Sequence, residues 1–219
     1  MKYYVVVDLE MCSVPPKKTY RYKHEIIQIG AALMNENLEI VDKYSGFVKP
    51  EIGSLDDFIS KLTGITSKDL KDAPHVEQAV KDFMAWLPEG EVVAISWSIT
   101  DKKQLQNELE LKNIPVDERL ERILDTWVDC QPMFTDKIKN ASRKRYSLEE
   151  ALVAADIITE GRAHDGLNDA YNTALLYAKM QREDELVLNS YYESAHDDSE
   201  SERLSFGLGD LLDSTLIKD

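Results

Sequence analysis

The sequence is poor in cysteine and basic residues, and it has no long apolar run. Its 219 residues include only Cys12 and Cys130, too few for a disulfide framework and too far apart for a zinc site. No segment reaches the roughly 18 consecutive apolar residues that a membrane-spanning helix needs, and the chain enters strand-like sequence directly, without a cleavable signal. We therefore expect a cytoplasmic protein with no membrane partner and with ordinary thiols.

Basic residues are outnumbered, 26 against 41 acids, which gives a net charge of −15. Such a charge argues against a polyanionic partner, because phosphate binding usually leaves a basic footprint. Residues 193–219 hold eight acids and two bases and so contribute −6, but the other 192 residues still carry −9. Divalent cations bound to clustered acids would reverse the local sign, so a nucleic-acid partner is not excluded.

The composition, 43% hydrophobic and 31% charged, suits one substantial core. We expect one folded domain over residues 1–185 and an acidic, partly disordered tail over 186–219. Within the tail, the pattern of 204–217 ("LSFGLGDLLDSTLI") is that of a short amphipathic segment, a candidate docking site for a protein partner.

Hydrophobic periodicity predicts an α/β fold with a mixed five-stranded sheet flanked by helices. The short polar link 35–37 predicts an antiparallel hairpin, which opens a meander that parallel strands follow. Strands are expected at 5–7, 25–34, 38–48, 91–97 and 124–128. Helices are expected at 55–62, 76–87, from 101 past Leu109, at 131–139, 148–155 and 167–181.

Acids follow the apolar strands. Asp8 and Glu10 are two residues apart and point to the same face at the end of the first strand, where they make half a metal site or simply mark a solvent-exposed strand end. Asp101 follows the fourth strand, as a third acid of the site or as an N-terminal cap or first-turn acid of the next helix. His164 and Asp169 would lie about 140° apart on one helix, so we expect His164 on the loop before it. Alone, His164 also reads as a surface or capping residue.

Together, Asp8, Glu10, Asp101, His164 and Asp169 resemble the active site of the DEDDh 3′–5′ exonucleases, a branch of the ribonuclease H-like fold. "DxE", an Asp after the fourth strand and "HxxxxD" follow the order of that family's three motifs. The similarity covers about residues 3–180, and "LTGIT" with "SW" is most similar to the branch of the 3′ histone-mRNA exonuclease and the KapD-like proteins. The sequence departs from the family pattern at three places. Gln28 stands where relatives often carry Glu, Ser98 and Ile99 replace a more usual Gly-containing pair, and Gly166 stands where some relatives carry Ala.

The resemblance implies a metal-dependent exonuclease that hydrolyses phosphodiester bonds at single-stranded RNA or DNA 3′ ends, RNA favoured, and releases 5′-mononucleotides. It implies two divalent cations, Mg²⁺ or Mn²⁺, held by Asp8, Glu10, Asp101 and Asp169, with His164 as general base. Hard carboxylate oxygens are the ligands that these ions prefer, and an imidazole titrates near the working pH. The alternative is a regulatory protein-binding module that retains the nuclease fold, as in KapD-like relatives.

Substrate contacts are expected beside the motifs. The resemblance places the "LTGI" segment near the terminal nucleotide, and the residues flanking the acids join it as candidates: Leu9, Met11, Leu62, Thr63, Gly64, Ile65 and Trp97. Gly64 also reads as a turn glycine, and Trp97 as a core residue. The basic run 137–145 and the cluster of Lys17, Lys18, Arg21 and Lys23 are candidates for contacting phosphates, or are solvated loop charges.

Overall fold

A five-stranded sheet forms the centre of the computed structural model, which describes residues 1–15, 23–138, 145–184 and 186. The strand order is β3-β2-β1-β4-β5. β1 pairs antiparallel with β2 and parallel with β4, so the fold is the predicted mixed sheet in which a meander precedes parallel strands. The five strands are β1 (Lys2–Ser13), β2 (His24–Met34), β3 (Ile40–Phe47), β4 (Glu91–Ser96) and β5 (Val128–Asp129).

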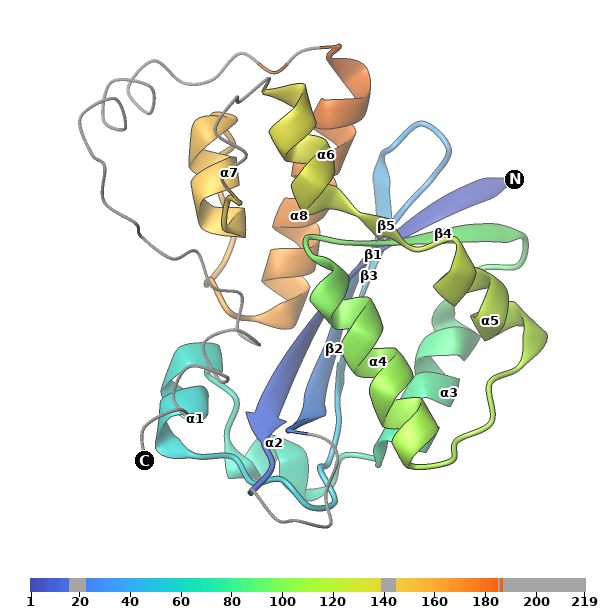
Figure 1. Ribbon diagram of the computed structural model, residues 1–219, viewed down its shortest axis with the longest axis vertical. Coiled ribbons are helices and arrows are strands. Elements are labelled where there is room, and N and C mark those ends of the chain that lie inside the picture. Colours follow the sequence, from blue (N-terminus) through green and yellow to red (C-terminus); the bar gives the residue numbers. More distant parts are fainter. Residues whose placement is uncertain (16–22, 139–144, 185, 187–219) are drawn as a thin grey trace.

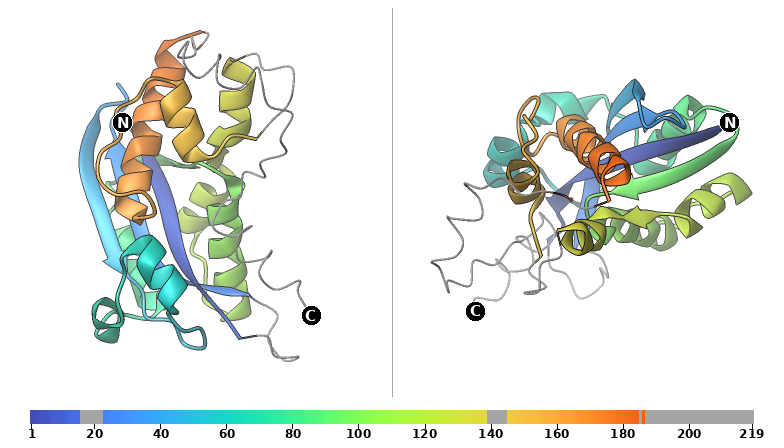
Figure 2. Two further views of the ribbon diagram at one scale, coloured as in Figure 1. Left: turned by 90° about the vertical axis from the view of Figure 1, so that its left-hand side faces the viewer. Right: turned by 90° about the horizontal axis from the view of Figure 1, so that it is seen from above.

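Helices cover both faces of this sheet. In Figure 1, α6, α7 and α8 group in the upper part and α3, α4 and α5 at the lower right, while Figure 2 shows α8 running alongside the strands. No helix in the described ranges is long and apolar enough to cross a membrane. The helices are α1 (Asp57–Thr63), α2 (Ser67–Lys71), α3 (Val76–Trp86), α4 (Ile99–Leu111), α5 (Glu118–Asp125), α6 (Cys130–Lys137), α7 (Leu148–Ala154) and α8 (Gly166–Arg182).

Alternation along β1 separates two cores. Val5, Val7 and Leu9 point to the face covered by α3, α4 and α5. Val6 points to the opposite face, in the core shared with α6, α7 and α8. Because side chains of a strand alternate between faces, Asp8 and Glu10 share the face of Val6 and are directed toward α8.

A buried ion network fixes α4 to the start of β2. Lys112 Nζ lies 2.7 Å from Glu25 and 2.9 Å from Glu108, two carboxylates whose side chains are 0% and 2% exposed. Glu25 also accepts backbone N–H bonds from residues 51–53, which lead into α1. The network therefore joins the helix that carries Asp101 to the segment that precedes residues 62–65.

Two expectations about the strands were wrong, and two helices, α2 and α5, were not expected. The fifth strand is 128–129 rather than 124–128, because Leu120, Ile123 and Leu124 follow helical spacing and are buried on α5. Helix α2 was not expected; it is only five residues long and begins at a capping box made by Thr66 and Asp69. The first strand does not end at Val7 but continues to Ser13.

Candidate active site

Asp8 and Glu10 lie within β1, not at its end. What ends is the pairing with β4, which stops at Val6 opposite Ile95. On the other edge, β1 stays paired with β2 through Ser13. Asp8 and Glu10 are therefore held on a strand that is paired on one edge and borders the cleft on the other. The expectation that the two acids mark the end of the first strand was wrong, because only the pairing with β4 ends before them.

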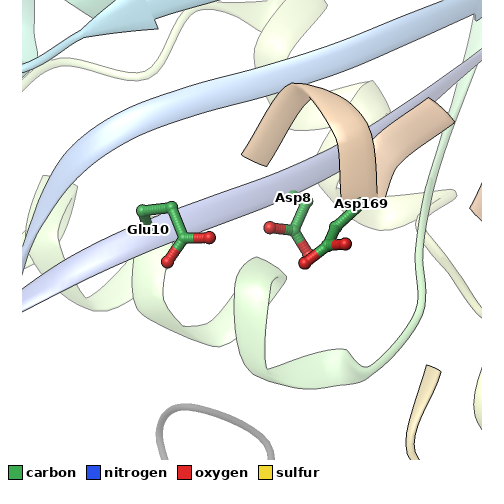
Figure 3. Close-up of side chains that lie close together, drawn as sticks. All are labelled: Asp8, Glu10 and Asp169. Carbon is green, nitrogen blue, oxygen red and sulfur yellow. The ribbon is translucent and has the colours of Figure 1, made fainter. Parts of the chain in front are cut away.

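The first turn of α8 brings Asp169 to these two acids. One carboxylate oxygen from each of Asp8, Glu10 and Asp169 lies within 4.8 Å of the others. Figure 3 shows the carboxylates of Asp8 and Asp169 turned toward one another, with Glu10 directed into the same space from further along β1. Three converging carboxylates form a donor set that suits a hard divalent cation.

Asp101 approaches from the other side of the site. It lies in the first turn of α4, whose N-cap is Ser98, and its side chain is buried. Its Oδ1 accepts a 3.1 Å hydrogen bond from the Leu9 backbone N–H, between the two acids of β1. Asp101 is outside the 4.8 Å group but lines the same cleft. It is a first-turn acid of α4, as the alternative had it, and it also lies at the site.

His164 stands just before α8. Its φ of 60° is in the left-handed region, and Asp165 follows it as the N-cap of the helix. The backbone N–H of His164 donates a 2.9 Å hydrogen bond to Oδ2 of Asp169. His164 thus lies on the loop and Asp169 within the helix, as the five-residue spacing indicated, and both line the cleft.

Burial and mutual repulsion disfavour the charged forms of the acids. Burial, then the neighbouring carboxylates, raises the pKa of Asp8 well above its usual value and that of Glu10 to about 9. Burial also raises the pKa of Asp101 to about 7, although the hydrogen bond from the Leu9 N–H partly lowers it. Burial raises the pKa of Asp169 to about 6. A bound cation would relieve this repulsion, so the electrostatics agree with the donor set.

The cleft around the acids has a volume of about 720 Å³, within the range of ligand-binding sites. Of the residues expected to contact substrate, Leu9, Met11 and Trp97 line it. Trp97 is also a core residue: only 8% exposed, it packs edge-on to Phe134 and donates a hydrogen bond to the Tyr146 carbonyl.

The segment 62–65 is not among the residues that line this cleft. Thr63 and Ile65 are buried, and Gly64 ends α1 with a φ of 80°, the role of a turn glycine. The guanidinium of Arg162 donates a hydrogen bond to the Lys61 carbonyl, which ties α1 to the loop that carries His164. A substrate role for 62–65 stays a prediction.

Much of the predicted basic surface falls outside the described residues, including Lys17, Lys18, Arg21 and positions 139–144. Two bases of the run 137–145 are among the described residues. Lys137 Nζ donates hydrogen bonds to the backbone carbonyls of Glu183 and Asp184. Arg145 lines the cleft.

Sequence reasoning missed Lys103, Asp129 and Glu149, which also line the cleft. Asp129 ends β5, which is parallel to β4, so a correct fifth strand would have placed it at the same sheet edge as the site. Lys103 lies two residues after Asp101 on α4, and Glu149 lies in the first turn of α7; neither carries a signal in the sequence that would have separated it from a surface charge.

Relatives of known sequence include exoribonucleases and a DNA polymerase III PolC-type from Caldanaerobacter subterraneus, which is 28% identical over 177 residues that cover 81% of this chain and 11% of that protein. The rat 3'-5' exoribonuclease 1 is 26% identical over 189 residues, which cover 81% of this chain and 52% of the rat protein. The mouse ERI1 exoribonuclease 2 is 27% identical over 201 residues, which cover 83% of this chain and 29% of that protein. The chain thus spans about half the length, or less, of these relatives.

Solved structures share the fold. The nuclease domain of 3'hExo, described as a DEDDh family member bound to rAMP, has a TM-score of 0.70 at 24% identity, over 86% of this chain and 96% of that chain. E. coli Exonuclease I in complex with a dT13 oligonucleotide has a TM-score of 0.63 at 13% identity, over 83% of this chain and 41% of that chain. The predicted ribonuclease H-like fold and DEDDh resemblance are confirmed. The family model RNase_T, described as exonuclease, matches residues 5–177, and this chain belongs to that exonuclease family.

Proposed function

We propose that this chain is a metal-dependent 3′–5′ exonuclease that removes 5′-mononucleotides from the 3′ ends of single-stranded nucleic acid. The observation that carries the proposal is the meeting of Asp8, Glu10 and Asp169 within 4.8 Å, in a cleft that Asp101 and His164 also line. Family membership supports the same reaction class.

The acids would hold two divalent ions, Mg²⁺ or Mn²⁺. Asp8, Glu10, Asp169 and Asp101 supply only carboxylate oxygens, which these hard ions prefer. The ions, when bound, supply charge stabilisation for the attacking and leaving oxygens of the phosphodiester. The thiols do not compete as ligands in the described structure, because both are buried, and burial raises the pKa of Cys12 to about 12.

His164 would act as the general base. Its hydrogen bond to Asp169 uses the backbone N–H, so it leaves the imidazole for proton transfer. Burial lowers the pKa of His164, assisted by Arg162 and opposed by Glu149. The neutral ring therefore prevails at neutral pH and can accept a proton from the attacking water.

The substrate strand would pass Lys103 and Arg145 on its way to the acids, since these two bases line an otherwise acidic cleft. Leu9, Met11, Trp97 and the segment 62–65 would contact the terminal nucleotide. We favour RNA over DNA because two of the relatives named above are exoribonucleases. We also keep a cytoplasmic location, with which the two free cysteines agree.

A regulatory role through protein binding alone is not favoured. Such a role gives no reason to gather four acids and His164 around one cleft. Its candidate docking segment, 204–217, lies outside the described residues.

The proposal is tested with 5′-end-labelled RNA and DNA of one sequence, each with a 3′-hydroxyl or a 3′-phosphate, in Mg²⁺ or Mn²⁺. We expect stepwise shortening from the 3′ end, faster on RNA and blocked by the 3′-phosphate. Internal cleavage, or no shortening of any strand in either metal, would contradict the proposal.

A further inference from the structure

Two residues of β2 lie directly across from the two acids of β1. Gly30 pairs with Asp8, and Gln28 pairs with Glu10. Directly opposed residues of antiparallel strands point to the same face of a sheet. Gln28 and Gly30 therefore share the face on which the acids meet α8, although neither lines the cleft.

Gly30 leaves room for the start of α8. A Cβ placed on Gly30 would lie 2.0 Å from the backbone carbon of Gly166, far inside any allowed contact. Gly166 is packed less tightly but still closely, because a Cβ on it would lie 3.2 Å from the backbone oxygen of Asp8. The first residue of α8 thus rests directly on the two strands that carry Asp8 and Gly30.

Gln28 supplies the hydrogen bond that holds this contact. The backbone N–H of Gly166 donates to Gln28 Oε1 at 3.1 Å. An N–H at the first position of a helix has no acceptor within the helix, so it needs one from outside. The N-cap Asp165 does not serve it, since the Asp165 side chain accepts from Asn168 N–H instead.

The amide of Gln28 is fixed in one orientation. Its Nε2 donates to Ser45 Oγ on β3 at 3.1 Å, so Oε1 is the atom left to face Gly166. The residue is only 1% exposed. Gln28 therefore joins β3 to the start of α8 through a buried side chain whose nitrogen and oxygen both take part in hydrogen bonds.

We propose that Gln28 is a positioning residue for the hydrolytic reaction, which holds Gly166 in place and thereby sets His164 and Asp169 against Asp8 and Glu10. His164 and Asp169 lie two residues before and three residues after Gly166 and are joined to each other by a hydrogen bond. A shift of the helix start would move both together relative to β1. This role rests on the proposed exonuclease activity and involves no contact with substrate.

Gln28→Met tests the role by removing the acceptor at nearly unchanged volume. We expect kcat to fall about 10- to 100-fold, the cost of a misplacement of about 1 Å in an active site. KM should stay within about twofold, because the cleft lining is unchanged. Gln28→Glu keeps an oxygen that can accept from Gly166 and one that can accept from the Ser45 hydroxyl, so it should restore kcat to within about threefold of the wild type.

Lys179→Met is the matched control. Lys179 lies on the same helix, far from Gly166, and its Nζ donates to the Ala155 carbonyl at 2.7 Å. Losing this bond should leave kcat unchanged. Wild-type kcat in Gln28→Met, failure of Gln28→Glu to recover activity, or an equal loss in Lys179→Met would each overturn the proposal.

Hydrogen exchange separates this proposal from the exonuclease activity. In the metal-free protein, the Gly166 amide should exchange at least about tenfold faster in Gln28→Met than in the wild type or Gln28→Glu, whatever the protein hydrolyses. Equal exchange would overturn the positioning role, whereas an inactive wild type with the expected exchange pattern would contradict only the exonuclease activity. If Gln28→Met does not fold, Gln28→Asn, whose shorter amide cannot reach Gly166, takes its place with the same expected losses.

Discussion

His164 and Asp169 are joined through the main chain: the His164 N–H donates a 2.9 Å hydrogen bond to Asp169 Oδ2, and the imidazole takes no part in it. The candidate base and a candidate metal ligand are therefore fixed relative to each other without using the ring that transfers the proton. Any substitution that keeps the backbone at 164 keeps this link, so the two roles can be separated by mutation.

His164→Asn should lose roughly 10² to 10⁴ in turnover, because the proton acceptor is gone. Metal affinity should stay near wild type, since the backbone N–H remains and Asn tolerates the φ of 60° better than most residues. Calorimetry with Mn²⁺ and single-turnover rates measure the two quantities.

Turnover of the wild type should also rise with pH through a titration below the usual histidine value, because burial lowers the pKa of His164. This limb should be missing from the residual activity of His164→Asn. A variant that turns over at the wild-type rate, or that loses metal affinity as strongly as turnover, would remove His164 from the role of base.

The contribution of the acid cluster to metal-free stability should fall as pH rises from about 4 to 9. Glu10 and Asp169 have folded-state pKa values of about 9 and 6, above those of an unfolded chain, so the folded state binds more protons in this interval. Raising the pH strips these protons and leaves repelling carboxylates. Mg²⁺ competes with the same protons, so the rise in melting temperature that it produces should be larger at pH 8 than at pH 5.5.

Thermal melts at both pH values, with and without Mg²⁺, measure this effect. Asp8→Asn is the matched variant, because it removes one charge from the cluster at nearly constant volume. It should flatten the pH dependence and shrink the Mg²⁺ effect. A metal-induced shift that does not depend on pH would contradict the view that cations and protons share these carboxylates.

Lys103→Ala and Arg145→Ala should each weaken single-strand binding. If each base contacts one phosphate, the slope of log affinity against log salt should fall by about 0.7 per substitution. Binding is measured in the His164→Asn background to slow cleavage. Lys137→Ala serves as control, since Lys137 is bonded to the carbonyls of Glu183 and Asp184. Slopes that match the control would return both bases to the role of solvated surface charges.

Lys112→Met should destabilise the fold by about 3 to 5 kcal/mol, because it leaves two buried carboxylates, Glu25 and Glu108, without their cation. Lys112 has a third partner, Glu51, whose side chain is 46% exposed. Glu51→Gln should therefore cost only about 0 to 1 kcal/mol. Urea unfolding compares the two. Equal losses would show that the network contributes no more than a surface ion pair.

The sequence predicts most of the sheet because its signals are local. Apolar runs and the polar link at 35–37 locate the first four strands, and the spacing of His164 and Asp169 indicates that one precedes a helix and the other lies within it. The two-residue β5 is too short to show a period, and the stronger helical spacing of Leu120 and Leu124 conceals it.

Contacts between side chains that are far apart in the sequence could not be predicted from the sequence alone. In the sequence, Gln28 stands out only as a position where relatives often carry Glu. The register with β1 and the hydrogen bond to Gly166, 138 residues away, reveal its place beside the site. Lys103 reads as one more surface lysine until the turn of α4 places it in the cleft.

The most direct test of the assigned site is the rate of 5′-mononucleotide release from a single-stranded RNA by the purified wild type and by Asp8→Asn, in Mn²⁺ and in excess chelator. Asp8 is one of the three carboxylates that meet within 4.8 Å, and Asn removes its charge with little change in volume. We expect release by the wild type only with metal, and a loss of about 10²- to 10³-fold in Asp8→Asn, the scale of a lost catalytic charge interaction. Full release in chelator, or a wild-type rate in Asp8→Asn, would show that the reaction does not occur at these carboxylates.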